Sequence, residues 1–107
     1  MALFHWLLQV PPGTDLTAYV EPAIRQAGLV LDAELSSQVQ IVAQDPLDAG
    51  LHHGSRVLLM MNWTNRSKGE LVVEVRSSEP MLKHQTRCEQ ISTALQRLLP
   101  SHVPGTN

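Results

Sequence analysis

The sequence has few of the residues that usually indicate a disulfide framework, nucleic-acid binding or membrane insertion. It contains one cysteine, Cys88, in 107 residues, which excludes an internal disulfide and fits a reducing compartment. Charged residues make up 17% of the chain, below the usual quarter, and the formal net charge is −2. Because no basic stripe is present, binding to nucleic acid through phosphates is not expected. No apolar run approaches the roughly 20 residues of a membrane-spanning helix, so no membrane insertion is predicted.

The length and the apolar content predict a single small domain. Apolar residues make up 43% of the chain, which is ordinary for a globular fold. We expect the domain over residues 1–100 and a flexible C-terminal tail over 101–107, which is polar and contains proline and glycine. The N-terminus lacks a basic segment, so it is interpreted as a strand rather than a signal peptide. The expected location is the cytoplasm, either free or at the periphery of a membrane complex.

Hydrophobic periodicity predicts five strands and two helices. Period-2 alternation indicates strands over 2–10, 29–35, 38–44, 56–64 and 70–77, with a loop over 45–55 and a hairpin turn over 65–69. A helix capped by Thr14 or Asp15 is predicted to end at Gly28. Pro22 predicts either a kink in this helix or a later start at Pro22 itself. A second helix begins near Thr86, whose spacing to Glu89 is that of a capping box, and ends before residue 100.

The order of these elements, β-α-β-β-β-β-α, predicts the fold class. Four consecutive strands follow the first strand and helix, which favours an α+β domain with a mostly antiparallel sheet of about five strands. Both helices carry one apolar stripe, so we expect them to pack on one face of the sheet.

The other face of the sheet is then left without a helical cover. A solvated antiparallel face normally alternates to polar residues, and this one does not. We expect Leu58 and Met60 in one strand, beside Val72 in its hairpin partner, to form an apolar patch of the kind that marks a contact surface. The alternative is that these are ordinary single exposed side chains, partly covered by the tail. The side chains assigned to this face are Leu3, His5, Leu7, Gln9, Val30, Val42, Leu58, Met60 and Val72.

The densest polar cluster spans the junction between the last strand and the last helix. Unsatisfied backbone N–H groups at a helix start favour an anion or a partner there. The alternative is structural: Arg76 pairs with Glu79, and Ser78 caps the turn. The cluster comprises Arg76, Ser77, Ser78, Glu79, Pro80, Lys83, His84, Thr86 and Arg87.

Residues that could carry catalysis or bind a metal lack the partner residues that such a site needs. His52 and His53 are adjacent, so their side chains diverge, and the spacing of a zinc site is absent. His84 could face Cys88 at the i,i+4 spacing, but no third orienting group is evident. No phosphate-binding loop is present. The sequence therefore assigns no catalytic, cofactor-binding or metal-binding residue, and no cofactor.

One stretch carries a resemblance. The run GELVVEVRSSEPMLK from Gly69 to Lys83, with Thr86-Arg87-Cys88-Glu89-Gln90 after it, resembles small conserved cyanobacterial proteins of unassigned function. The resemblance implies an accessory or assembly protein of photosynthetic or bioenergetic machinery. It implies no site residue.

Three functional expectations remain open at this point. The first is a non-enzymatic accessory or assembly factor that binds a protein partner through the uncovered sheet face and the junction over 76–87. The second is a small-ligand-binding domain or enzyme with a pocket between sheet and helices, for which His5, His84, Cys88 and Arg76 would be the polar groups. The third is a homodimer joined face to face. The residues proposed for protein binding are Leu58, Met60, Val72, Arg76, Lys83 and Arg87.

Overall fold

A computed structural model describes residues 2–47, 50, 56–80 and 86–99 of the chain. Within these residues the fold is the predicted α+β class, with one five-stranded sheet and two helices. The elements are β1 (Ala2–Gln9), α1 (Leu16–Gln26), β2 (Val30–Leu31), β3 (Gln40–Gln44), β4 (Leu58–Asn65), the 3-10 helix η2 (Arg66–Lys68), β5 (Glu70–Ser77) and α2 (Arg87–Leu98). The predicted tail over 101–107 lies outside the described residues.

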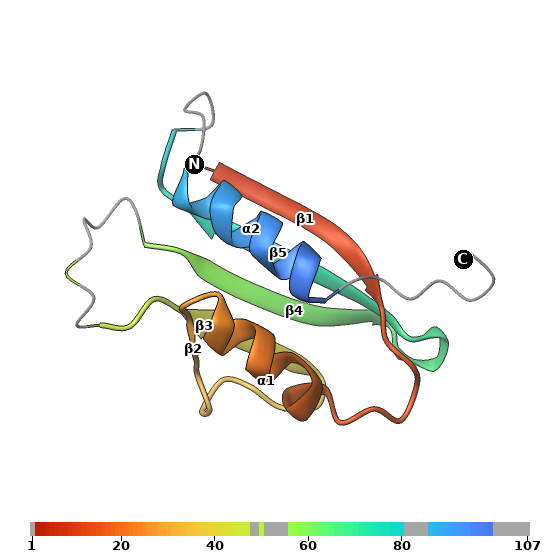
Figure 1. The fold of residues 1–107 in the computed structure, drawn as a ribbon. Coiled ribbons are helices and arrows are strands. Elements are labelled where there is room, and N and C mark those ends of the chain that lie inside the picture. The colour runs from red at the N-terminus through yellow and green to blue at the C-terminus, as the bar shows by residue number, and fades with distance from the viewer. Residues whose placement is uncertain (1, 48–49, 51–55, 81–85, 100–107) are drawn as a thin grey trace.

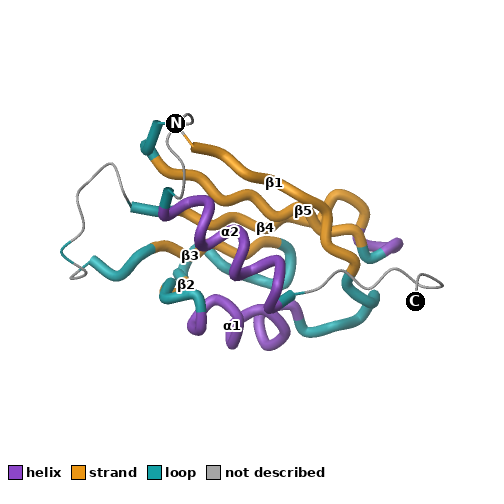
Figure 2. Tube along the Cα trace, turned by 45° about the horizontal axis from the view of Figure 1, so that its top comes forward, coloured by secondary structure: helices purple, strands orange, loops and turns teal. Residues whose placement is uncertain are grey.

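The sheet is antiparallel at every pairing, in the order β1-β5-β4-β3-β2. The first strand therefore returns to pair with the last one, Ala2 opposite Ser77 and Gln9 opposite Glu70. Figure 1 shows both helices on the same side of the sheet, and the turned view of Figure 2 confirms this arrangement. The chain thus builds two layers, as the amphipathic stripes of the helices require.

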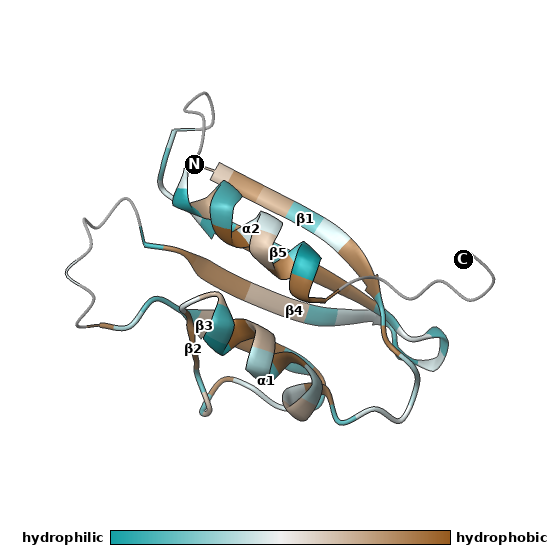
Figure 3. Cartoon of the chain, in the orientation of Figure 1, coloured by the Kyte–Doolittle hydropathy of each residue, from teal (hydrophilic) through white to brown (hydrophobic). Residues whose placement is uncertain are grey.

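The core fills the space between the two layers. Alternate residues of β1, β4 and β5 point into it, and the helices contribute one stripe each. Trp6 and Trp63 are half-buried and pack against this core. Figure 3 shows the apolar first half of β4 in view between the two helices. The largest fully buried side chains are Leu8, Leu16, Ile24, Ile41, Leu59, Met61, Leu71 and Leu95.

The helix starts follow local capping rules. The Asp15 carboxylate accepts a hydrogen bond from the Ala18 N–H at 3.3 Å and begins α1. Pro22 lies inside this helix, so a start at Pro22 is wrong. The Thr86 hydroxyl accepts from the Glu89 N–H at 3.0 Å, which confirms the predicted start of α2.

The predicted strand over 29–35 is too long, because only Val30–Leu31 pairs with β3. The Asp32 carboxylate accepts hydrogen bonds from the N–H groups of Glu34 at 3.0 Å and Leu35 at 3.2 Å. These local bonds turn the chain out of the sheet, in competition with the strand ladder. Leu35 is consequently exposed rather than directed inward.

Candidate protein-binding face

The side of the sheet opposite the helices, which we call the open face, is covered by no element that the structure describes (Figure 2). Strand register arranges its side chains in rows that run across the strands. The first row is Leu3, Arg76, Leu58, Gln44 and Val30; the second is His5, Glu74, Met60 and Val42; the third is Leu7, Val72, Asn62 and Gln40. All nine side chains predicted for this face are therefore on it, with Gln9 next to the third row.

The apolar residues of the open face do not form an unbroken patch. Leu58 lies opposite Arg76, and Met60 lies opposite Glu74, so Val72 is only a diagonal neighbour of Met60. Arg76 Nη1 lies 3.8 Å from Glu74 Oε1, and Arg76 Nη2 donates to the Met60 sulfur at 3.6 Å. An ion pair on β5 thus separates Leu58 and Met60 from the apolar residues of β1.

Exposure on the open face is partial rather than complete. Leu58, Met60 and Val72 are half-buried by their neighbours on the sheet, whereas Leu7 and Val30 are 55% and 52% exposed. The face mixes apolar side chains with the Glu74–Arg76 ion pair, the carboxylate of Glu70 and several amides, a composition that ordinary protein surface also has.

Arg87, which was predicted to join this site, lies on the helix side of the sheet. Its Nη2 is 2.5 Å from Oδ1 of Asp45, a residue that is only 2% exposed. The second carboxylate oxygen of Asp45 accepts from the Val57 N–H at 2.8 Å, and the Arg56 guanidinium donates to the Asp45 carbonyl oxygen at 2.7 Å. Arg87 therefore ties the start of α2 to the end of β3. Lys83 and His84 lie outside the described residues.

The backbone N–H groups at the start of α2 are bound by a carboxylate of the chain itself. Glu79, 5% exposed, accepts from the N–H of Arg87 at 3.0 Å and from the N–H of Cys88 at 3.1 Å. The Ser77 hydroxyl donates to Glu79 Oε1 at 2.8 Å and also accepts from the Glu79 N–H at 3.2 Å. An anion attracted to this helix start would have to displace Glu79.

The ion pair between Arg76 and Glu79 that the sequence offered as an alternative is not the one observed. Arg76 pairs with Glu74 on the open face, while Glu79 caps α2. The one sequence signal for the cap was an acidic residue a few positions before Thr86. Asp45 gave no such signal, because its partner Arg87 is 42 residues away.

The Cys88 thiol is held in a site that disfavours a nucleophile. The residue is fully buried, and Sγ lies 3.3 Å from the carbonyl oxygen of Val75. Burial raises the pKa of the thiol from its ordinary value of 9.0 to about 11, and the charge of nearby Glu79 acts in the same direction. Cys88 therefore stays protonated at neutral pH and packs as a small hydrophobe.

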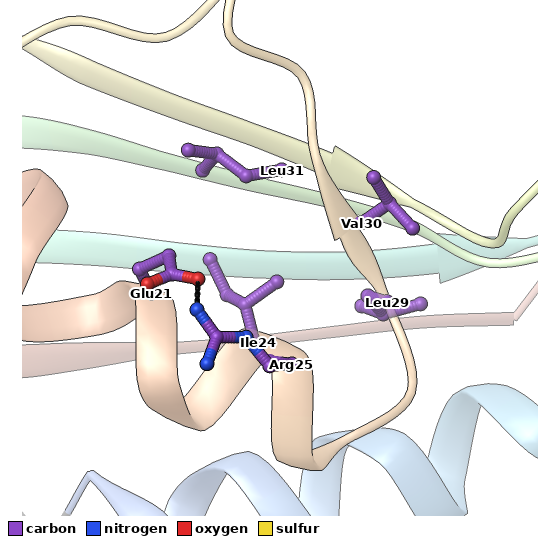
Figure 4. A pocket seen from close by; sticks show the side chains of 6 residues that line it. All are labelled: Glu21, Ile24, Arg25, Leu29, Val30 and Leu31. Atoms are coloured by element: carbon purple, nitrogen blue, oxygen red, sulfur yellow. Dashed lines mark hydrogen bonds and ion pairs between the residues drawn. The ribbon is translucent and has the colours of Figure 1, made fainter.

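A hollow of about 420 Å³ lies between α1 and the edge strand β2. Ile24, Leu29 and Leu31 provide apolar walls, and the ion pair between Glu21 and Arg25 lies at its rim (Figure 4). The polar groups predicted for a ligand pocket, His5, Arg76 and Cys88, do not line it. The hollow is therefore a second surface, separate from the open face except at Val30.

Within the described residues, no three histidine, cysteine, aspartate or glutamate side chains are grouped as metal ligands would be. His52 and His53 lie outside these residues. Among the helices described, none has the length and apolar content needed to cross a membrane. Comparison of the chain with protein-family models, with curated proteins and with solved structures gave no match.

Proposed function

We propose that this chain is a non-enzymatic protein-binding domain that docks through its open face. The observation that carries the proposal is a five-stranded antiparallel sheet whose two helices lie on one side, with Leu3, Leu7, Leu58, Met60 and Val72 on the other. A solvated antiparallel face normally alternates to polar residues, so apolar side chains retained there support contact with another surface.

The polar groups on the helix side support the same conclusion. Asp45 and Arg87 bind each other, and Glu79 is engaged by the start of α2. The thiol of Cys88 is buried with a raised pKa. These groups stabilise the fold, whereas a catalytic site needs groups that can reach a substrate.

The resemblance of residues 69–90 to small cyanobacterial proteins favours one class of binding protein. On this basis the chain acts as an accessory or assembly factor, with the machinery of photosynthesis or bioenergetics as its setting. An accessory role suits a small domain of low charge, because its surface offers contact area rather than chemistry.

The test is site-specific cross-linking in cells of the source organism. A photoreactive amino acid is placed at Met60 on the open face or, as the matched control, at Thr93, an exposed position on α2. We expect protein adducts from position 60 and far fewer from position 93. Equal yields from the two positions, or no adduct from position 60, would overturn the proposal.

The hollow beside β2 favours a second candidate function, the binding of a small apolar ligand. Its walls are apolar side chains of α1 and β2, with a charged pair at the rim, which is the usual make-up of a ligand site. A chain acting only in this way would give no protein adduct from Met60, so the same experiment separates the two functions.

A further inference from the structure

The short strand β2 is an edge of the sheet, and it presents one donor and one acceptor of its backbone outward. Asp32 donates its N–H to the carbonyl oxygen of Val42 at 2.8 Å, so the preceding residue, Leu31, directs its own N–H and C=O away from β3. Within the described residues no group bonds to this N–H or this C=O. Outward backbone groups on a sheet edge can pair with a strand from another chain.

The hollow between α1 and β2 lies beside this free edge. Its volume is about 420 Å³, and its apolar walls are Ile24, Leu29 and Leu31 (Figure 4). The side chain of Leu31 points to the helix side of the sheet, because its neighbour Val30 is on the open face and successive side chains alternate. Residues directly opposite each other in an antiparallel pair project on the same face. A residue paired with Leu31 would therefore direct its side chain toward the hollow.

The charges around the β2 edge are mostly negative. Residues 26–55 contain four carboxylates and no lysine or arginine. The ion pair at the rim of the hollow has no net charge, and Asp45 is bound by Arg87. Asp32 and Glu34 form no ion pair with any residue that the structure describes. Two carboxylates without a cation favour a basic segment as the partner of this edge.

Asp32 indicates where in an added strand the basic residue belongs. Asp32 lines a second, smaller hollow of about 170 Å³, which also has Val30 and Leu31 among its lining residues. Its Oδ1 accepts from the N–H groups of Glu34 and Leu35, which leaves Oδ2 for a cation. In an antiparallel strand, the residue opposite Asp32 directly precedes the residue opposite Leu31. The complementary sequence is therefore a basic residue followed by an aliphatic one.

We propose that the free edge of β2 binds an extended segment of a partner protein as an additional antiparallel strand, with an aliphatic side chain in the hollow beside α1 and a basic residue directly before it. A peptide suits this site because its backbone complements the outward N–H and C=O of Leu31, which an apolar small molecule would leave unpaired. Since β2 has only two residues, side-chain contacts supply much of the affinity. The inference goes beyond the proposed function and does not depend on docking through the open face.

The experiment uses the peptide TKLTVT with acetylated and amidated ends as its probe. Its leucine is placed opposite Leu31, its lysine opposite Asp32, and its valine on the same side as the leucine. NMR titration of the isotope-labelled chain measures the dissociation constant and identifies the amides that respond. We expect saturable binding with one of the largest shifts at the amide of Leu31, and no shift at the amides of Met60 and Val72.

Two N-methylated peptides separate strand pairing from simple apolar contact. Methylation of the leucine nitrogen removes the N–H that donates to the Leu31 carbonyl oxygen and obstructs the pairing, so we expect at least about fivefold weaker binding. Methylation of the next threonine nitrogen is the matched control. That N–H points away from β2, so the affinity should change less than about twofold.

Side-chain exchanges in the peptide test the hollow and the charge. Serine in place of the leucine should weaken binding at least about fivefold, because no apolar group then enters the hollow. Glutamate in place of the lysine should also weaken binding. The difference between lysine and glutamate should shrink in the Asp32→Asn chain, whose Oδ1 can still accept the hydrogen bonds of the turn.

Four results would overturn the inference. The first is no saturable binding of TKLTVT at millimolar concentration, and the second is a set of shifts centred away from β2. The third is equal affinity of the peptide methylated at leucine, since apolar groups then enter the hollow without strand pairing, as a small ligand would. The fourth is a lysine preference that the Asp32→Asn chain keeps in full, which contradicts the assigned alignment.

Failure of this inference and failure of the proposed function are distinguishable. Cross-linking from Met60 reports on the open face, whereas the peptide titration reports on β2. Adducts from Met60 without binding of TKLTVT support docking through the open face and overturn the strand addition. Binding of TKLTVT at β2 without adducts from Met60 does the reverse.

Discussion

Replacing Glu79 with glutamine is expected to lower the free energy of unfolding by about 2–4 kcal/mol. The carboxylate is almost fully buried and accepts the N–H groups of Arg87 at 3.0 Å and Cys88 at 3.1 Å, one on each oxygen. Glutamine keeps one acceptor oxygen, and its NH₂ group then faces a backbone N–H that has lost its partner. The lost hydrogen bond to a charged group is worth about 1.5–3 kcal/mol. The lost negative charge at the helix start adds about 0.3–1 kcal/mol.

Urea unfolding at pH 7, followed by circular dichroism and by the fluorescence of Trp6 and Trp63, measures this change. The transition midpoint is expected to fall while its slope stays constant, because the surface exposed on unfolding is unchanged. The matched control is Glu70→Gln at the start of β5, a half-buried position where less than about 0.5 kcal/mol is expected. If Glu79→Gln costs no more than this control, Glu79 is not the cap that the structure shows.

Two further predictions concern single residues of the core and of a turn. Gly69 and Gly28 both have positive φ, 70° and 87°, but a Cβ at Gly69 would overlap the carbonyl oxygen of Val10, whereas Gly28 has open space. Gly69→Ala should therefore destabilise by at least about 2 kcal/mol more than Gly28→Ala in thermal or urea unfolding, and equal effects would contradict the close approach of β1 to the turn. The pKa of Cys88 is raised to about 11, so between pH 9.0 and about 11 the unfolded chain loses this proton first and stability falls as the pH rises. Cys88→Ser should flatten that slope in unfolding measurements, and an unchanged slope would show that other groups cause it.

The sequence predicted the elements well wherever a local rule fixes them. Thr86 and Asp15 cap helices because their side chains reach N–H groups only three residues away. The prediction was wrong at 29–35, where alternation continued past the end of pairing. There the Asp32 carboxylate bonds to the backbone of Glu34 and Leu35 and ends the strand. These short-range hydrogen bonds of Asp32 ended the strand although the alternation of apolar residues continued beyond it.

The candidate site, too, was predicted only where a local rule applies. Alternation placed Leu58, Met60 and Val72 on the open face, because side chains two residues apart on a strand always share a face. It could not place Glu74 opposite Met60, or Arg76 opposite Leu58, since those neighbours depend on the register between strands. The sequence therefore predicted which residues share the face but not the ion pair that divides it.

By itself, the sequence determined the two-layer fold class and the residues that turn inward, since both follow from periods and caps that act over a few residues. Only the tertiary structure decided that β1 returns beside β5, that Glu79 binds the start of α2, and that Arg87 reaches Asp45. The partners are selected by how whole elements pack, whether they are 8 residues apart, as Glu79 and Arg87 are, or 42, as Asp45 and Arg87 are. Local patterns do not specify these partners, and they equally leave open which side chains lie opposite Glu74 and Arg76 on the open face.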